Sequence, residues 1–174
     1  MSNENALPGR WLSVCFLLLL LSWGAAVAPP PAIAGSATAT LGVSFTINAA
    51  CTVSAAPIAF SAQSVLGVPV SQTGSVVVTC SNTSPYNVQL DQGAGASATV
   101  TNRLMTGPAS GTVAYGLYQD AARTVNWGKT NGADTVAGTG AGGAQTLTVY
   151  GRIMAQTTPA PGAYADTVNV TVSY

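Results

Sequence analysis

The sequence has very little charge and no histidine. Only 6% of its residues are charged, with five basic and five acidic side chains, and its one glutamate is Glu4. General acid–base catalysis and metal binding depend mainly on histidine, carboxylates and free cysteines. A balanced, sparse set of charges also cannot attract the phosphates of a nucleic acid. The composition therefore predicts that the protein is not an enzyme, needs no cofactor or metal, and does not bind nucleic acid.

The first thirty-four residues differ from the rest of the chain, which has no sustained helical period. The N-terminal region contains Arg10, then an apolar run over residues 11–27, then the small-residue sequence AIA at 32–34. This order is typical of a secretory signal peptide that is cleaved before Gly35. We therefore expect residues 1–34 to be removed and the mature protein to be exported. A retained membrane anchor is the alternative, although the run is short for a membrane-spanning helix.

The remaining chain is a series of short alternating segments separated by turn residues. Strict alternation of apolar and polar residues is the signature of a strand with one buried face. The segments that show it are 75–80, 86–91, 112–119, 145–154 and 165–174, with 57–60 as a shorter candidate. Segments 81–85, 91–98, 105–111, 130–143 and 157–163 have the composition of loops. This spacing predicts an all-β fold, an antiparallel sandwich of immunoglobulin type.

The longest uninterrupted alternation is ATATLGVSFTI, residues 37–47, close to the predicted mature N-terminus. Its larger odd-numbered residues are Leu41, Val43, Phe45 and Ile47, and its even-numbered residues are small or polar. The pattern predicts a strand with one buried face. It does not say whether that face is buried in its own domain or in another molecule.

Two cysteines lie after the predicted cleavage site, Cys51 and Cys80. An even pair in an exported protein predicts a disulfide. The entropy lost by closing such a loop in the unfolded chain corresponds to roughly 3.5 kcal/mol of stabilisation. Because the spacing is far from C-x-x-C and histidine is absent, a redox or metal site is the weaker interpretation.

Four aromatic side chains raise the possibility of a carbohydrate-binding platform. They are Tyr115, Tyr118, Trp127 and Tyr150. The simpler interpretation is that Tyr115 belongs to the core and that Trp127 covers a loop.

Several motifs together resemble the spore coat protein U domain family, which includes subunits of archaic chaperone–usher pili. They begin with the alternating N-terminal segment that leads into AACTV, and continue with GSVVVTCS and YNVQLDQG. Later motifs are NRLM, VAYGLYQDAARTVNWG, LTVYGRI and the ending PGAYADTVNVTVSY. The resemblance covers nearly all of the chain after the predicted signal peptide. LYQDAARTVNWG and the ending are its most specific parts.

The resemblance implies an incomplete immunoglobulin fold that lacks one strand. Residues 35–48 would then be a donor-strand extension and residues 49–174 a pilin-like domain. Leu41, Val43, Phe45 and Ile47 would fill the groove of a neighbouring subunit. The implied partners are copies of the chain or related pilins, a periplasmic chaperone and an outer-membrane usher. The C-terminal strand, with Val168, Val170, Val172 and Tyr174, is expected to border the open groove and face the chaperone.

Three alternatives remain at this stage. Residues 37–47 could fold back in cis as the first strand of their own domain. The protein could be a secreted binding module, such as a single-domain adhesin that uses its aromatic residues. It could also be a surface or spore coat protein, the role that named the family. The resemblance implies export through the periplasm to the cell surface or the extracellular space, as part of a pilus.

Overall fold

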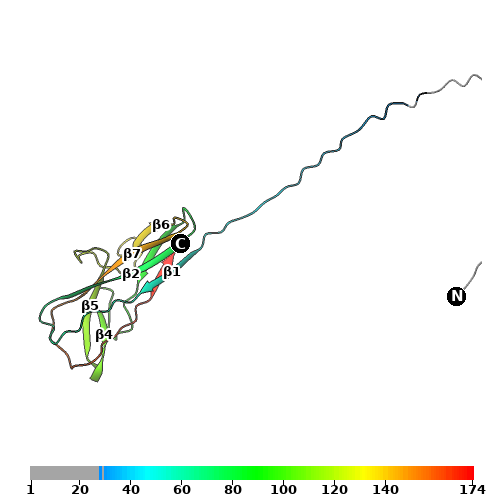
Figure 1. Ribbon diagram of the computed structural model, residues 1–174. Helices are drawn as coiled ribbons and strands as arrows, with labels where there is room; N and C mark the ends of the chain where they lie inside the picture. Colours follow the sequence, from blue (N-terminus) through cyan, green and yellow to red (C-terminus); the bar gives the residue numbers. More distant parts are fainter. Residues whose placement is uncertain (1–27, 29) are drawn as a thin grey trace, which may run out of the picture. The chain divides into compact units, whose positions relative to one another are not determined.

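The computed structural model describes residue 28 and residues 30–174 (Figure 1). Most of the predicted signal peptide, residues 1–27 and 29, lies outside the described residues. Within the described part of the chain, no helix is long and apolar enough to cross a membrane. Residues 45–174 form one compact unit, and all the strands of the described part of the chain lie in it.

The larger sheet has five strands, and each neighbouring pair is antiparallel. Its spatial order is β1 (Cys51–Ala56), β2 (Val70–Cys80), β7 (Ala144–Ile153), β5 (Thr112–Tyr118) and β4 (Arg103–Thr106). The smaller sheet has three antiparallel strands in the order β6 (Val136–Thr139), β3 (Pro85–Leu90) and β8 (Val170–Ser173). One short 3₁₀ helix, η1 (Pro108–Ser110), lies between β4 and β5. The predicted all-β sandwich is confirmed.

The core lies between the two sheets and is built from the alternating residues that the sequence identifies. In β2, Val76 and Val78 are buried, and in β3, Val88 and Leu90 are buried opposite them. Because side chains alternate across a strand, one face of β2 and one face of β3 supply the core. Burial of side chains of this size stabilises the fold by about 1.5–3 kcal/mol each.

The strand boundaries differ from the predictions at several places. β2 begins earlier than expected, at Val70, while the predicted strand at 165–174 is shortened to β8, Val170–Ser173. Residues 57–60 form no strand, although Ile58 and Phe60 pack against the core. No strand forms over residues 37–47 either.

The prediction that residues 130–143 form only a loop is wrong, because β6 lies inside this range. The segment is rich in glycine, which normally indicates a turn. Here Gly138 is needed for packing instead. A Cβ atom at this position would come within 2.5 Å of the Tyr86 ring on β3. The glycine therefore allows an edge strand to lie flat over an aromatic side chain. β4 was also missed, because it is short and runs into the predicted loop 105–111.

One charged side chain, Arg103, is completely buried. Its guanidinium donates hydrogen bonds to the backbone carbonyl oxygens of Leu90, Asp91, Val100 and Trp127, at 2.7–3.0 Å. A buried charge is tolerated only when its hydrogen-bonding groups are satisfied. Arg103 therefore fastens β4 to the end of β3 and to the loop that contains Trp127.

Candidate functional site: an open groove between the sheets

The candidate site is the side of the sandwich where β1 and β8 meet. β1 is an outer strand of the larger sheet and β8 an outer strand of the smaller one. The two strands lie near one another. Within residues 30–174, no strand pairs with the free edge of either. Both edges therefore present backbone groups that could pair with an added strand.

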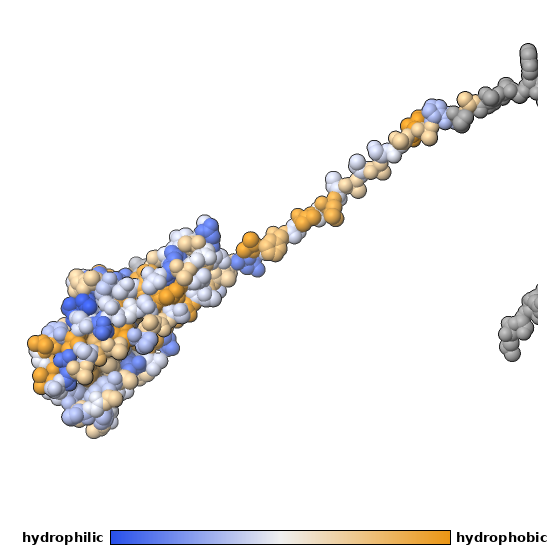
Figure 2. All heavy atoms as spheres, viewed as in Figure 1, coloured by the Kyte–Doolittle hydropathy of each residue, from blue (hydrophilic) through white to orange (hydrophobic). Residues whose placement is uncertain are grey.

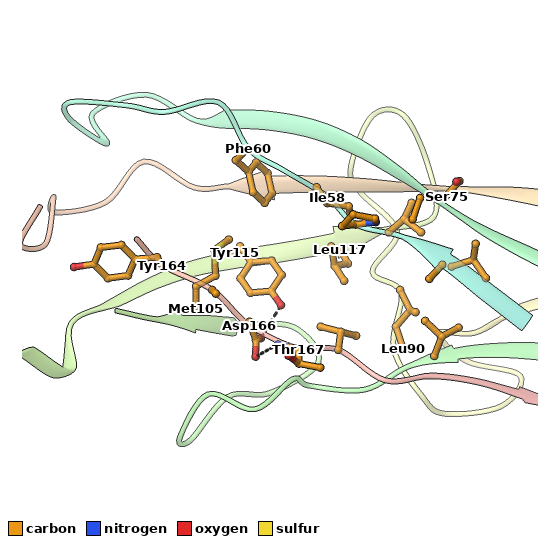
Figure 3. A pocket seen from close by; sticks show the side chains of 18 residues that line it. Ile58, Phe60, Ser75, Leu90, Met105, Tyr115, Leu117, Tyr164, Asp166 and Thr167 are labelled. Carbon is orange, nitrogen blue, oxygen red and sulfur yellow. Dashed lines mark hydrogen bonds between the residues drawn. The ribbon is translucent and has the colours of Figure 1, made fainter. Parts of the chain in front are cut away.

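A hollow of about 450 Å³ opens along this side (Figure 3). Its floor is apolar and includes Leu90, Leu117 and Val149. Ile58 and Phe60 form the wall that follows β1. Val168 and Val170 line the opposite rim, just before and at the start of β8. We call this hollow the groove.

A second hollow of about 750 Å³ lies beside the groove. The two hollows share the lining residues Ile58, Phe60, Met105 and Tyr164, so they are adjacent. The second hollow adds Leu66, Val113 and Ile153 to the lining. Apolar side chains thus line both neighbouring hollows, which suits the alternate apolar side chains of an added strand.

The wall formed by Ile58 and Phe60 depends on two glycines in the neighbouring strands. A Cβ atom at Gly74 of β2 would approach Ile58 to 2.5 Å, and one at Gly151 of β7 would approach Phe60 to 2.9 Å. The two glycines thus leave a shelf on the inner face of the sheet, and the segment after β1 lies on it. The apolar alternation of Ile58 and Phe60 was visible in the sequence, but the shelf was not.

The rim of the groove is a crossover between the two sheets. Ala165 exchanges two backbone hydrogen bonds with Thr106 of β4, at 2.9 and 3.0 Å. Five residues later, Val170 pairs with Leu90 in the other sheet. The intervening residues 166–169 have no continuous strand partner and are held by carboxylates instead.

Asp166 is the first of these carboxylates. It accepts hydrogen bonds from the Tyr115 hydroxyl at 2.7 Å and from the backbone N–H groups of Ala94 and Thr167 at 2.7 and 2.8 Å. Burial and the bond to Asp166 raise the pKa of Tyr115 above its usual value. Tyr115 therefore stays neutral and remains a donor at physiological pH.

Asp91 is the second carboxylate. It accepts hydrogen bonds from the backbone N–H groups of Gly93 and Asn169, both at 2.9 Å, and from the Asn169 side chain at 2.6 Å. Burial by itself would raise the pKa of Asp91, but these bonds outweigh burial and lower the pKa below its usual value. The two aspartates thus position the groove rim with charge-assisted bonds. Sequence reasoning did not assign them a role because only the fold brings them to the rim.

The segment that was predicted to donate a strand is exposed along its whole length. Residues 30–50 contain no regular secondary structure. Leu41, Val43, Phe45 and Ile47 are each 80–89% exposed. Four large apolar side chains with the same parity are therefore accessible to solvent on one extended segment.

The other predicted site residues are placed as follows. The predicted disulfide is present, and it joins Cys51 and Cys80 where they lie directly opposite each other in the β1–β2 ladder. Val168 and Val170 line the groove, and Val172 is half-buried against the core. Tyr174, with the same parity, is 62% exposed.

The four aromatic residues considered as a carbohydrate platform do not lie on one exposed surface. Tyr115 is buried, as expected. Trp127 does not cover a loop as predicted: it is 1% exposed in the core, and its indole N–H donates to the Val88 carbonyl at 2.9 Å. Tyr150 is half-buried, with the Arg123 guanidinium 5.7 Å from the centre of its ring.

Comparison with known proteins agrees with this architecture. The Spore Coat Protein U domain family matches residues 37–171. Protein U of Myxococcus xanthus is 33% identical over 165 residues, which cover 85% of this chain and 90% of Protein U. A chain of the CsuC–CsuE chaperone–tip adhesion subunit pre-assembly complex, from the archaic chaperone-usher Csu pili of Acinetobacter baumannii, has a similar fold. The TM-score is 0.54 at 21% identity, and the match covers 74% of this chain but only 41% of that solved chain.

Proposed function

This chain belongs to the Spore Coat Protein U domain family, and we propose that it is a structural subunit of a secreted surface pilus. In this proposal each subunit donates residues 35–48 to the groove of a neighbouring copy or a related pilin. The domain proper is residues 49–174. A periplasmic chaperone occupies the groove before assembly, and an outer-membrane usher exchanges the chaperone strand for the donor strand. The protein thus passes through the periplasm to the cell surface.

The observation that carries the proposal is that one chain contains both an open apolar groove and an exposed apolar segment. The domain has an apolar groove between the free edges of β1 and β8. The same chain has an extended segment whose four large apolar side chains are 80–89% exposed. An added strand would pair with a free edge through backbone hydrogen bonds and place alternate side chains in the groove. By itself, the open groove or the exposed segment would favour aggregation. The segment would supply the strand that the groove edge lacks, and the groove would bury the apolar side chains of the segment.

Burial of the donor side chains is the main favourable term in the assembly that we propose. Burial of Leu41, Val43, Phe45 and Ile47 contributes about 1.5–3 kcal/mol per side chain, or roughly 6–12 kcal/mol together. The conformational entropy lost when the segment becomes ordered offsets much of this gain. Backbone hydrogen bonds at the groove edge add a smaller net term.

Assembly into a spore or surface coat is the second candidate function. It is favoured by the 33% identity with Protein U over 90% of that protein. A coat subunit could use the same donor segment and groove, so the two candidates differ in the form of the assembly. A single-domain adhesin has less support, because its candidate aromatic residues are divided between the core and the surface.

Deletion of residues 35–48 tests the proposal. The full-length mature protein should form a ladder of oligomers that resists mild denaturant, and the deleted protein should remain monomeric or bound to its chaperone. A synthetic peptide of residues 35–48 should bind the deleted protein in a 1:1 complex and raise its melting temperature. The control peptide has Asp in place of Phe45 and should not bind. Polymerisation of the deleted protein to the normal yield would refute donation by this segment.

A further inference from the structure

Two tyrosines and two arginines lie on the outer face of the larger sheet, the face opposite the groove. In β7, Val149 and Ile153 are buried in the core, so Tyr150 and Arg152 point away from it. Tyr118 of β5 lies directly opposite Tyr150 in the ladder, and cross-strand partners share a face. A donor strand in the groove would therefore leave these side chains accessible. We call Tyr118, Arg123, Tyr150 and Arg152 the outer-face cluster.

The two arginines of the cluster are close neighbours. Arg123 Nε donates a hydrogen bond to the carbonyl oxygen of Gly151, the residue before Arg152, at 3.1 Å. Arg152 Nη2 in turn donates to the carbonyl oxygen of Ala122, the residue before Arg123, at 3.4 Å. The Arg123 guanidinium also lies 5.7 Å from the centre of the Tyr150 ring. Two like charges, which repel one another, are thus held side by side next to an aromatic ring.

No carboxylate of the described residues forms a hydrogen bond with this pair of arginines. Glu4 lies outside the described part of the chain, and the four aspartates accept hydrogen bonds from other groups. These aspartates are Asp91, Asp120, Asp134 and Asp166. Charge is scarce throughout the domain, and in Figure 2 strongly hydrophilic residues occupy only small areas of the surface in view. Two adjacent cations in this setting favour an anion that another molecule supplies.

Arg152 differs from Arg103 in how its hydrogen-bond donors are used. Arg103 donates to four carbonyl oxygens at 2.7–3.0 Å, as expected of a structural arginine. The bond from Arg152 to Ala122 is long, at 3.4 Å, and Arg152 Nε is buried without a partner among residues 30–174. A guanidinium has five N–H donors, and unsatisfied donors in a native structure require an explanation. The terminal nitrogens of Arg152 are therefore available to a ligand.

Gly116 places the hydroxyl group of Tyr118 beside Arg152. Gly116 pairs with Arg152 in the β5–β7 ladder, and a Cβ atom at Gly116 would come within 2.5 Å of the Tyr118 hydroxyl oxygen. The Tyr118 ring therefore lies back over the glycine, toward Arg152. On the other side of β7, the exposed Ser71 lies opposite Arg152. Hydroxyl groups that can donate or accept hydrogen bonds thus border the guanidinium on both sides.

We propose that the outer-face cluster binds an acidic saccharide, a sugar of the uronic acid type. The arginines would bind its carboxylate, because the planar guanidinium fork matches a planar carboxylate. A uronic acid bears this group directly on its sugar ring, so a carboxylate at the arginines places the ring beside Tyr150 and Tyr118. Tyrosine suits such a contact, since it presents an apolar ring with a polar tip. The inference does not depend on how the subunits assemble, although a polymer would repeat the site and gain avidity for a polysaccharide.

Calorimetric titration of the mature protein with trigalacturonate tests the site. The matched neutral ligand is galactotriose, and acetate supplies a carboxylate without a sugar ring. Trigalacturonate should bind at least about ten-fold more tightly than either of these, and its affinity should fall as salt is added. Equal affinity for galactotriose, for acetate or for inorganic phosphate would overturn the inference, as would the absence of binding by trigalacturonate.

Substitutions locate the binding on the outer face. Arg152→Gln should lower the affinity for trigalacturonate about ten-fold, and Arg152→Lys, which keeps the charge but loses the fork, about three-fold. Tyr118→Phe removes one hydroxyl without a change of charge and should lower the affinity about two-fold. The matched control is Lys129→Gln, because Lys129 is exposed and donates to Gln92 instead.

The control variant should bind trigalacturonate as the unsubstituted protein does. Melting temperatures of all four variants should stay close to that of the unsubstituted protein, since none of the changed side chains belongs to the core. Equal losses of affinity in Arg152→Gln and Lys129→Gln would show attraction by net charge alone and would overturn the site. Unchanged affinity in Arg152→Gln, Arg152→Lys and Tyr118→Phe would do the same.

Discussion

β7 and residues 37–47 have the same alternating pattern but different environments. In β7, Val149 and Ile153 are 3% and 7% exposed, and the strand pairs with β2 on one side and β5 on the other. In residues 37–47, the corresponding apolar side chains are 80–89% exposed and no strand forms. Alternation therefore specifies which face of a segment is to be buried, but it does not specify what covers that face. The partner is decided by which edges the rest of the fold leaves open.

The strongest test of this difference places the same charge in both segments. Val149→Asp should unfold the domain, because an unpaired buried charge destabilises it by more than about 3 kcal/mol. Phe45→Asp should leave the chaperone-bound monomer folded and disulfide-bonded, yet abolish polymer formation. Monomer folding is measured by circular dichroism and polymer yield by the denaturant-resistant ladder.

Thr46→Asp is the matched control for Phe45→Asp, because it places the charge on the opposite face of the donor segment. It should assemble almost normally. If Phe45→Asp destroyed the monomer as thoroughly as the polymer, the segment would be a cis strand of its own domain and donation in trans would be wrong.

The disulfide lies where the donor segment joins the sheet, and its removal should have the next largest effect. Replacing Cys51 and Cys80 together with Ala should lower the free energy of unfolding by roughly 3.5 kcal/mol, the chain-entropy estimate. Denaturant titration of the monomer measures this change. The reduced unsubstituted protein is the control and should show a similar loss. Detection of two free thiols in the oxidised, unsubstituted protein would contradict the disulfide assignment.

A charge at the groove rim should have a moderate effect on stability. Val170 lines the groove and is half-buried, so Val170→Asp should destabilise the monomer by roughly 1–3 kcal/mol. It should also prevent recovery of the subunit with its chaperone. Thr171→Asp, on the exposed face of the same strand, should affect neither. Equal recovery of both variants would show that this edge is not the one the chaperone occupies.

Acid should have the smallest effect, through Asp91 at the crossover. The folded-state pKa of Asp91 is lowered, so its contribution to stability is complete above the unfolded pKa of about 3.9. That contribution is lost as the pH falls through the folded pKa. Asp91→Asn should therefore show a shallower loss of stability than the unsubstituted protein in unfolding titrations between pH 7 and pH 2.5. Parallel pH profiles would mean that Asp91 does not support the rim by its charge.

Part of the candidate site could be predicted from the sequence. Alternation identified the inner faces of β2, β3, β5 and β7, and the paired cysteines identified the disulfide. β6 was missed because a glycine that accommodates Tyr86 has the same sequence signal as a turn glycine. β4 was missed because it is short and runs into the predicted loop 105–111. The shelf under Ile58 and Phe60, formed by Gly74 and Gly151, was missed because it depends on contacts between distant segments.

The sequence by itself determined the class of fold and the buried face of each alternating strand. It also determined that residues 37–47 form a further alternating apolar segment. These properties are local, since a period of two and the composition of turns act over a few residues. The tertiary structure decided that Arg103 is buried with hydrogen bonds to four carbonyl oxygens. It also decided that Asp91 and Asp166 each accept hydrogen bonds that hold the crossover. It also decided that the free edges of β1 and β8 border one groove. These features depend on contacts between residues far apart in the chain, and no local pattern encodes which distant edge remains unpaired.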